Sequence, residues 1–161
     1  MARQDIDRPV QQPLLDRLID EDPRSNVEPP LTRSQSVRAL KAAVRRDLEW
    51  LLNSRAMAGQ PEGFEEAGRS VIYFGIPDVT SLSGDSTEDR VRLLRMIETA
   101  IETYEPRLAN IRISENDTSA AGGRQIRFLV QGLLRMDPSP EQVFFDTVLD
   151  LAKGEYEIKG D

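Results

Sequence analysis

Glu105-Pro106-Arg107 stands where the residue pattern of the chain changes from helical to extended. Residues 91–104 repeat apolar side chains at helical spacing, whereas residues 108–114 alternate apolar and polar side chains. Proline disfavours the helical conformation in the residue before it, so a helix is expected to end at or near Glu105. Arg107 then begins a strand. The tripeptide predicts a corner between helix and sheet that carries two opposite charges.

The charges of this corner have two alternative roles. They can pair with each other inside the fold, as an ion pair at the helix end. They can instead face another molecule, and we expect this role because two charges separated by a rigid residue are too few for a solvated charge run. Reversing the charge of Arg107 is then expected to weaken partner binding more than it weakens stability.

Two long amphipathic helices are predicted before the corner. The first covers residues 32–55, and its apolar positions step by 3, 4, 4 and 3 along Val37, Leu40, Val44, Leu48 and Leu51. Three residues suit its N-cap, namely Thr32, Ser34 and Ser36. The second begins near Glu88, with Asp85, Ser86 or Thr87 as its cap. Its stripe is expected on Val91, Leu94, Ile97, Ile101 and Tyr104, with Leu93 and Ala100 beside it.

Strands are predicted after the corner. Three segments alternate apolar and polar residues, at 108–114, 125–131 and 142–147, and a weaker alternation includes Tyr156 and Ile158. Phenylalanine falls on both faces of the third segment, which indicates that both faces are covered. The apolar run 71–74, a strand or a helical turn, is expected to be buried.

These elements predict an α+β domain with a small, mainly antiparallel sheet of three or four strands. A sheet of this size does not close, so it has edges that natural proteins usually protect. An open edge can also accept a strand from another chain. The sequence does not indicate which edge would do so.

The first 31 residues are expected to form an arm, and residues 32–159 the domain. Residues 1–13 are polar and contain two prolines, so they are predicted to be disordered. A short helix follows at 14–19, with an apolar stripe that includes Leu14, Leu15 and Leu18. Because so short a helix is unstable alone, it must dock on its own domain, which we expect, or on a partner. Three prolines make residues 20–31 an extended connector.

Composition excludes several classes of chemistry. The chain has 161 residues, with no cysteine and no histidine, so thiolate nucleophiles, zinc-thiolate sites and imidazole bases are absent. No apolar run approaches the length of a membrane helix, and the start lacks the apolar block of a signal peptide, so a cytoplasmic location without membrane insertion is expected. A net charge of −7 argues against nucleic acid as the main partner.

The charge is unevenly distributed along the chain. Residues 32–55 carry six basic and two acidic side chains, whereas residues 141–161 carry two basic and six acidic ones. Such a surface suits assembly with oriented partners, although solvated faces give the same pattern. The basic helix leaves open a generic binding module for an acidic partner.

No catalytic, cofactor or metal site is predicted. Gly122-Gly123-Arg124 lacks the spacing of a phosphate-binding loop, and no EF-hand pattern occurs. A glycosidase would need Glu105 as its acid, together with a second carboxylate. Arg107 nearby would lower the pKa of such an acid, whereas this role needs a raised pKa. A peptidoglycan-cleaving, lysozyme-like enzyme is therefore only the alternative.

Five strings in order resemble one family. They are Leu14-Leu15-Asp16-Arg17-Leu18, Arg46-Asp47-Leu48-Glu49-Trp50-Leu51-Leu52-Asn53, Phe74-Gly75-Ile76-Pro77-Asp78, Glu105-Pro106-Arg107 and Phe145-Asp146-Thr147-Val148-Leu149-Asp150. Together they resemble TssE, the family of baseplate subunits in bacterial type VI secretion systems. That family is related to the small baseplate wedge protein of contractile phage tails.

The resemblance implies a structural protein of a six-fold baseplate. It implies wedge partners TssF and TssG, contact with the first ring of the TssB/TssC contractile sheath, and TssK as a further candidate partner. The sheet would resemble the fold of the sheath subunit and offer an edge for sheath strands. Glu105, Pro106 and Arg107 would form an interaction motif facing the wedge. Some relatives are labelled lysozyme-like, which nothing in this chain supports.

Overall fold

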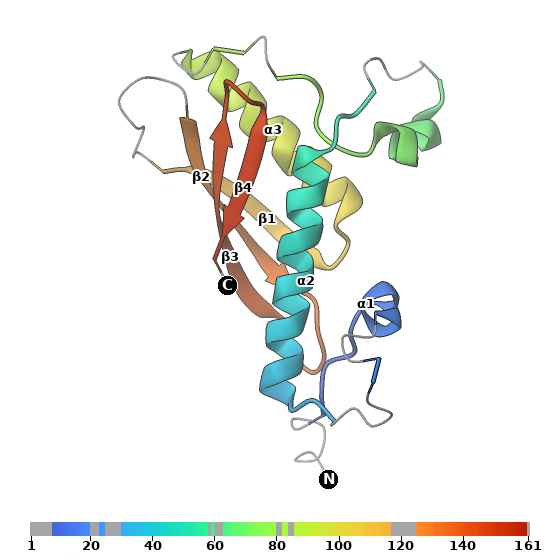
Figure 1. Ribbon diagram of the computed structural model, residues 1–161. Coiled ribbons are helices and arrows are strands. Elements are labelled where there is room, and N and C mark those ends of the chain that lie inside the picture. Colours follow the sequence, from blue (N-terminus) through green and yellow to red (C-terminus); the bar gives the residue numbers. More distant parts are fainter. Residues whose placement is uncertain are drawn as a thin grey trace.

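The computed structural model describes residues 8–19, 23–24, 30–57, 59, 63–79, 82–83, 86–116 and 125–160. Its helices are α1 (Leu14–Leu18), α2 (Arg33–Asn53) and α3 (Thr87–Tyr104), with two 3₁₀ turns, η1 (Glu65–Arg69) and η2 (Val71–Tyr73) (Figure 1). Its strands are β1 (Leu108–Glu115), β2 (Gln125–Leu134), β3 (Glu141–Asp150) and β4 (Glu155–Lys159). The predicted disorder of residues 1–7, most of the connector 20–31 and most of the turn 115–123 lie outside the described residues.

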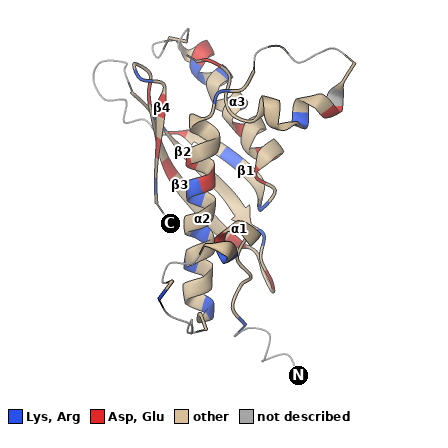
Figure 2. Cartoon of the chain, turned by 45° about the vertical axis from the view of Figure 1, so that its right-hand side comes forward, with Lys and Arg blue, Asp and Glu red and all other residues tan. Residues whose placement is uncertain are grey.

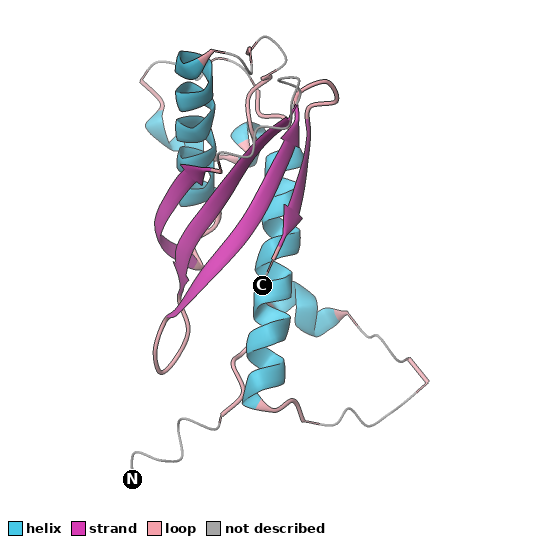
Figure 3. Cartoon of the chain, turned by 90° about the vertical axis from the view of Figure 1, so that its left-hand side faces the viewer, coloured by secondary structure: helices cyan, strands magenta, loops and turns pink. Residues whose placement is uncertain are grey.

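The four strands form one sheet in the order β1-β2-β3-β4, with every neighbouring pair antiparallel. Figure 3 shows α2 and α3 on the same face of this sheet. The core lies between these two helices and the sheet, and its largest fully buried side chains include Leu48, Ile97, Phe128 and Phe145. The predicted α+β class and the open antiparallel sheet are confirmed, including the weak fourth strand.

Helix α2 begins as the sequence predicts. The Thr32 side chain accepts a hydrogen bond from the Gln35 N–H, and the Gln35 side chain accepts one from the Thr32 N–H, which completes a capping box. The predicted stripe is buried from Leu40 to Leu51, while Val37 is half-buried. Trp50 is 67% exposed and lies outside the core.

Helix α3 is capped by the Ser86 side chain, which accepts from the Asp89 N–H. Its buried face is rotated from the predicted one, because Val91 is 44% exposed while Leu93 is fully buried. Leu93, Ile97 and Ile101 follow each other at intervals of four, so they share one face toward the sheet. Two of the predicted stripe positions, Leu94 and Tyr104, are half-buried at its margin.

Buried and exposed residues do not alternate regularly along strand β1. Asn110 has a φ of 51°, and the pairing with β2 shifts between Ala109 and Arg112, which marks a β-bulge. Asparagine tolerates this left-handed conformation better than most residues. Because of the extra residue, Leu108 and Ile111 are buried, rather than Ala109, Ile111 and Ile113.

Two burial predictions are wrong. The run 71–74 starts with the turn η2, and Val71 and Ile72 are 84% and 61% exposed, whereas Phe74 is half-buried and packs against the core. This segment extends away from the sheet, which α2 and α3 already cover (Figure 1). On β3, Phe144 is 40% exposed, because both long helices pack on the opposite face of the sheet.

The expected disorder is also wrong for residues 8–13. The Val10 N–H donates to Ser36 Oγ at 2.8 Å, and Gln12 Nε2 donates to the Ser36 carbonyl at 2.7 Å. Ser36 is fully buried on α2, and Val10 packs against the core. This short extended segment is therefore fixed to the first turn of the helix.

Candidate functional site

The predicted corner exists between α3 and β1. The Glu105 N–H donates to the Ile101 carbonyl at 2.9 Å and closes the last turn of α3. The Leu108 N–H then donates to the Glu105 carbonyl at 3.1 Å. The Arg135 N–H donates to the Arg107 carbonyl at 2.8 Å, which attaches the corner to the end of β2. The backbone of the corner is thus held from both sides.

The two charges of the corner pair inside the fold. The Glu105 carboxylate accepts from the Arg107 backbone N–H at 3.1 Å and from its Nε at 2.6 Å, and Arg107 Nη2 contacts its second oxygen. Arg107 Nη2 also donates to Asp47 Oδ2, on α2, at 2.7 Å. Glu105 is only 4% exposed. The expectation that the corner presents both charges to a partner is therefore wrong for Glu105.

The ion pairs continue from the corner to the N-terminal helix. Asp47 Oδ1 accepts from Arg46 Nη2 at 2.9 Å, and Arg46 Nη1 lies 2.7 Å from Asp16 Oδ1 on α1. Figure 2 shows charged bands of both signs on α2 beside α1. A single line of alternating charges thus joins α1, α2 and the corner.

The neighbouring carboxylates stabilise the charged form of Arg46 and Arg107. Burial alone would lower the pKa of Arg107, but hydrogen bonds to Glu105 and Asp47 outweigh it, and the pKa is raised above its ordinary value. Hydrogen bonds to Asp16 and Asp47 raise the pKa of Arg46. Both arginines therefore keep their charge within this line of ion pairs.

Helix α1 contacts the domain through its charge and not through its apolar stripe. Leu14, Leu15 and Leu18 are 69%, 60% and 73% exposed, whereas Asp16 pairs with Arg46. The expectation that the stripe packs on its own domain is wrong. Sequence periodicity found the leucines but missed the role of Asp16, which pairs with a residue of α2 far along the chain.

Sequence reasoning also missed a contact at one edge of the sheet. Asn53 Nδ2 donates to the Tyr156 carbonyl, and the Tyr156 N–H donates to Asn53 Oδ1, both at 2.9 Å. Antiparallel strands alternate between residues that bond their neighbour and residues that face away from it. Because both backbone groups of Tyr156 bond a side chain of α2, they face away from β3. Asn53 therefore covers this position of the β4 edge.

The opposite edge is uncovered. The Asn116 N–H donates to the Arg127 carbonyl, so the pair at 116 and 127 is hydrogen-bonded. Alternation along the register then makes Ile113 and Glu115 face away from β2. Between described residues, no side chain forms a hydrogen bond with the backbone of β1. Among the described residues, the β1 edge is thus free and the β4 edge is partly covered.

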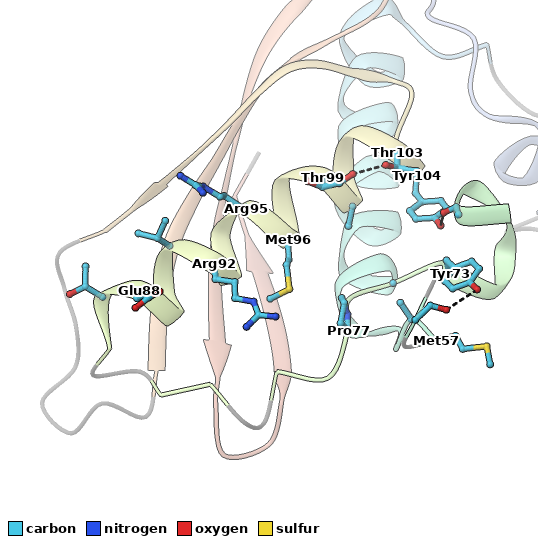
Figure 4. A pocket seen from close by; sticks show the side chains of 17 residues that line it. Met57, Tyr73, Pro77, Glu88, Arg92, Arg95, Met96, Thr99, Thr103 and Tyr104 are labelled. Atoms are coloured by element: carbon cyan, nitrogen blue, oxygen red, sulfur yellow. Dashed lines mark hydrogen bonds between the residues drawn. The ribbon is translucent and has the colours of Figure 1, made fainter. Parts of the chain in front are cut away.

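A large groove lies between α3 and the segment around η2. Its volume is about 1130 Å³, and its apolar lining includes Met57, Tyr73, Met96 and Tyr104. Figure 4 shows Arg92 and Arg95 on the α3 side. Glu88 is the one acidic side chain among the described residues that line it. A glycosidase needs two facing carboxylates, so this groove gives that activity no support.

The buried ion pair is equally unsuited to acid catalysis. Both Glu105 oxygens accept hydrogen bonds from Arg107, and the side chain is 5% exposed. An acid that protonates a substrate must reach it. Within the described ranges, no group of three potential His, Cys, Asp or Glu metal ligands occurs, and no helix has the length and apolarity to span a bilayer.

Residues 38–139 match the family model described as "Baseplate wedge protein gp25". The chain belongs to this family. No curated protein and no solved structure matches the chain significantly. The matched region includes most of α2, all of α3, the corner and the first two strands, while α1, β3 and β4 lie outside it. The resemblance to baseplate wedge proteins is confirmed.

Membership in the gp25 wedge family gives the chain a structural role in a phage tail-like baseplate, in contact with other baseplate components. Two features of this wedge protein fit that role. Its described surface combines an exposed leucine stripe on α1 with an uncovered edge on β1. Both are features that another protein chain can cover.

Proposed function

We propose that this wedge protein is the subunit of a cytoplasmic type VI secretion baseplate that links the wedge to the contractile sheath. On one side it joins TssF and TssG. On the other it templates the first ring of TssB/TssC by accepting sheath strands at its sheet edge. The family match and the open sheet support this proposal, and the uncovered edge of β1 carries it.

Strand addition is assigned to β1. The outward N–H and C=O groups of Ile113 and Glu115 have no side-chain cap between described residues, whereas Asn53 occupies those of Tyr156 on β4. β4 is also short and carries the exposed charges Glu155, Glu157 and Lys159, which are typical devices of a protected edge.

A backbone ladder explains how one subunit can set the geometry of a sheath. Each added strand residue bonds a fixed partner, so a shift of one residue would turn every side chain to the opposite face. The bulge at Asn110 interrupts the regular part of β1. The register is therefore defined from Arg112 to Glu115, where pairing with β2 is regular.

The wedge side of the proposal rests on α1 and the corner. Leu14, Leu15 and Leu18 are exposed, as are Pro106 and about a quarter of the Arg107 side chain. We assign these residues to contact with the wedge, and the buried Glu105 orients Arg107 for that contact. The ion pairs from Asp16 to Arg107 connect the two surfaces.

The variant Ile113→Pro tests whether the β1 edge accepts a strand of the sheath. Because the Ile113 N–H faces away from β2, proline removes a donor for an incoming strand without breaking the bond ladder to β2. Ile113→Ala loses similar packing but keeps the N–H, so it is the matched control. Ile158→Pro makes the equivalent change on β4. Sheath assembly is followed by fluorescence of a labelled sheath subunit in cells.

We expect Ile113→Pro to abolish sheath assembly and both Ile113→Ala and Ile158→Pro to permit it. Assembly by Ile113→Pro together with its loss in Ile158→Pro would move the docking edge to β4. Normal assembly by both proline variants, each shown to be folded, would refute strand addition altogether.

A further inference from the structure

A second pocket lies at the other end of α2 from the apolar groove. Its volume is about 960 Å³, and it is bordered by residues 8–13, the start of α2, the corner and the turn after β2. Four arginines line it, and they come from these four different segments: Arg8, Arg33, Arg107 and Arg135. The one acidic side chain among the described lining residues is Asp137.

The walls of this arginine pocket are held in place by hydrogen bonds. Arg33 Nη1 donates to the Arg8 carbonyl at 3.1 Å, and its Nη2 donates to the Asp137 carbonyl at 3.0 Å. Arg33 therefore joins the N-terminal segment to the β2–β3 turn. The bonds from Val10 and Gln12 to Ser36 fix the same segment to α2. The shape of the pocket is therefore defined by hydrogen bonds between the segments that line it.

The pocket keeps an excess of positive charge. The charge of Arg107 is balanced by Glu105 and Asp47. Arg33 donates to backbone carbonyls, which carry no net charge. Between described residues, the exposed side chain of Arg135 forms no hydrogen bond or ion pair. Arg33 and Arg135 together outweigh the carboxylate of Asp137, so they create a local site for anions on a chain whose net charge is −7.

The remaining lining indicates what kind of anion fits. Apolar side chains line the same pocket, namely Pro9, Val10, Pro13, Leu40, Met136 and Pro138. Guanidinium groups match carboxylates through paired, planar hydrogen bonds. We propose that the arginine pocket binds a protein segment that carries both carboxylate and apolar side chains, supplied by another baseplate subunit.

Identification of that partner as a baseplate subunit rests on the proposed function, whereas the preference for carboxylates does not. Nucleic acid fits less well, because a long polyanion would also meet the negative surface of the rest of the chain. The walls around the pocket further favour a side-chain ligand over an extended phosphate backbone.

A labelled short peptide of alternating glutamate and alanine probes the pocket by fluorescence anisotropy with the full chain. The peptide with glutamine in place of glutamate is the uncharged control. Arg135→Glu is the test variant, and Arg127→Glu is its control, since Arg127 is also exposed and lies on β2. We expect Arg135→Glu to weaken binding of the acidic peptide about tenfold or more, and Arg127→Glu to change it little. Arg135→Lys is expected to be intermediate.

Four results would overturn this assignment. Two concern the peptides: binding of no acidic peptide by the wild-type chain, and binding of the glutamine peptide as tight as that of the acidic one. The other two are equal weakening by Arg127→Glu, and tighter binding of a single-stranded oligonucleotide than of the acidic peptide. None of these results bears on the β1 edge, which the Ile113→Pro variant tests separately.

Discussion

Asn53, the last residue of α2, bonds both backbone groups of Tyr156 on β4, with both hydrogen bonds at 2.9 Å. This contact satisfies two groups that would otherwise be available to another strand. It also attaches the last strand to the first long helix. One side chain therefore contributes to stability and decides which edge of the sheet is free.

Asn53→Ala should lower the free energy of unfolding by about 1–3 kcal/mol, because both partly buried backbone groups of Tyr156 lose their partner. It should also promote self-association, because it uncovers the β4 edge. Urea denaturation measures the first effect and sedimentation velocity the second. Asn53→Asp keeps the acceptor for the Tyr156 N–H, so its stability should lie between those of the natural chain and Asn53→Ala. A monomeric Asn53→Ala protein of unchanged stability would contradict the role of this contact.

Tyr156 predicts how stability changes at high pH. Its hydroxyl is buried and has no hydrogen-bond partner in the part of the chain that the structure describes. Burial raises its pKa, a shift that the nearby Arg55 opposes. The unfolded chain ionises this phenol near its ordinary pKa of about 10, while the folded chain keeps the proton. The unfolded state then binds fewer protons, so stability should fall as pH rises above about 10.

Tyr156→Phe should remove this part of the alkaline loss. The ring would still pack edge-on against Phe128, whose centroid lies 6.5 Å from that of Tyr156. Because the variant also removes an unsatisfied buried hydroxyl, its stability at pH 7 should equal or exceed that of the natural chain by about 1 kcal/mol. Urea denaturation of both proteins from pH 7 to about pH 11 gives the comparison. Parallel pH profiles would show that the phenol does not ionise differently in the two states.

The sequence predicted the elements better than their contacts. Helical and strand periods located α2, α3 and all four strands, because burial of one face leaves a local pattern. The rotated face of α3 and the bulge at Asn110 depend on how β1 packs, which local spacing does not contain. For the same reason the pairs Asp16–Arg46, Asp47–Arg107 and Asn53–Tyr156 were not predictable, since each joins residues far apart in the chain.

The corner shows this limit most clearly. The tripeptide indicated both the turn and its two charges, and left two roles open. Asp47 decides between them, because it supplies a second carboxylate from α2 and encloses Arg107 in an internal network. Glu105-Pro106-Arg107 is therefore first a structural element, and its contact with a partner is restricted to Pro106 and the exposed part of Arg107.

Removing the Arg107 side chain should cost more free energy of unfolding than removing the charge of its partner Glu105. Arg107→Ala leaves the buried Glu105 carboxylate without its guanidinium, and should lower the free energy of unfolding by about 3–5 kcal/mol. Glu105→Gln leaves an arginine that is 24% exposed and still paired with Asp47, so it should cost less. Urea denaturation of both variants tests the order. If Glu105→Gln lowers the free energy of unfolding more than Arg107→Ala, the main cost does not come from leaving the buried Glu105 carboxylate unpaired.

The leucines of α1 should separate binding from stability. Leu14, Leu15 and Leu18 are at least 60% exposed, so changing all three to serine should alter the free energy of unfolding by less than about 0.5 kcal/mol for each residue. Loss of this apolar surface should reduce co-purification with TssF and TssG, because apolar area buried in an interface contributes to binding. Leu48→Ala, at a fully buried position, is the contrasting control and should cost about 2–5 kcal/mol. Undiminished co-purification of the triple serine variant would remove α1 from the wedge interface and leave Pro106 and Arg107 as its only proposed contacts.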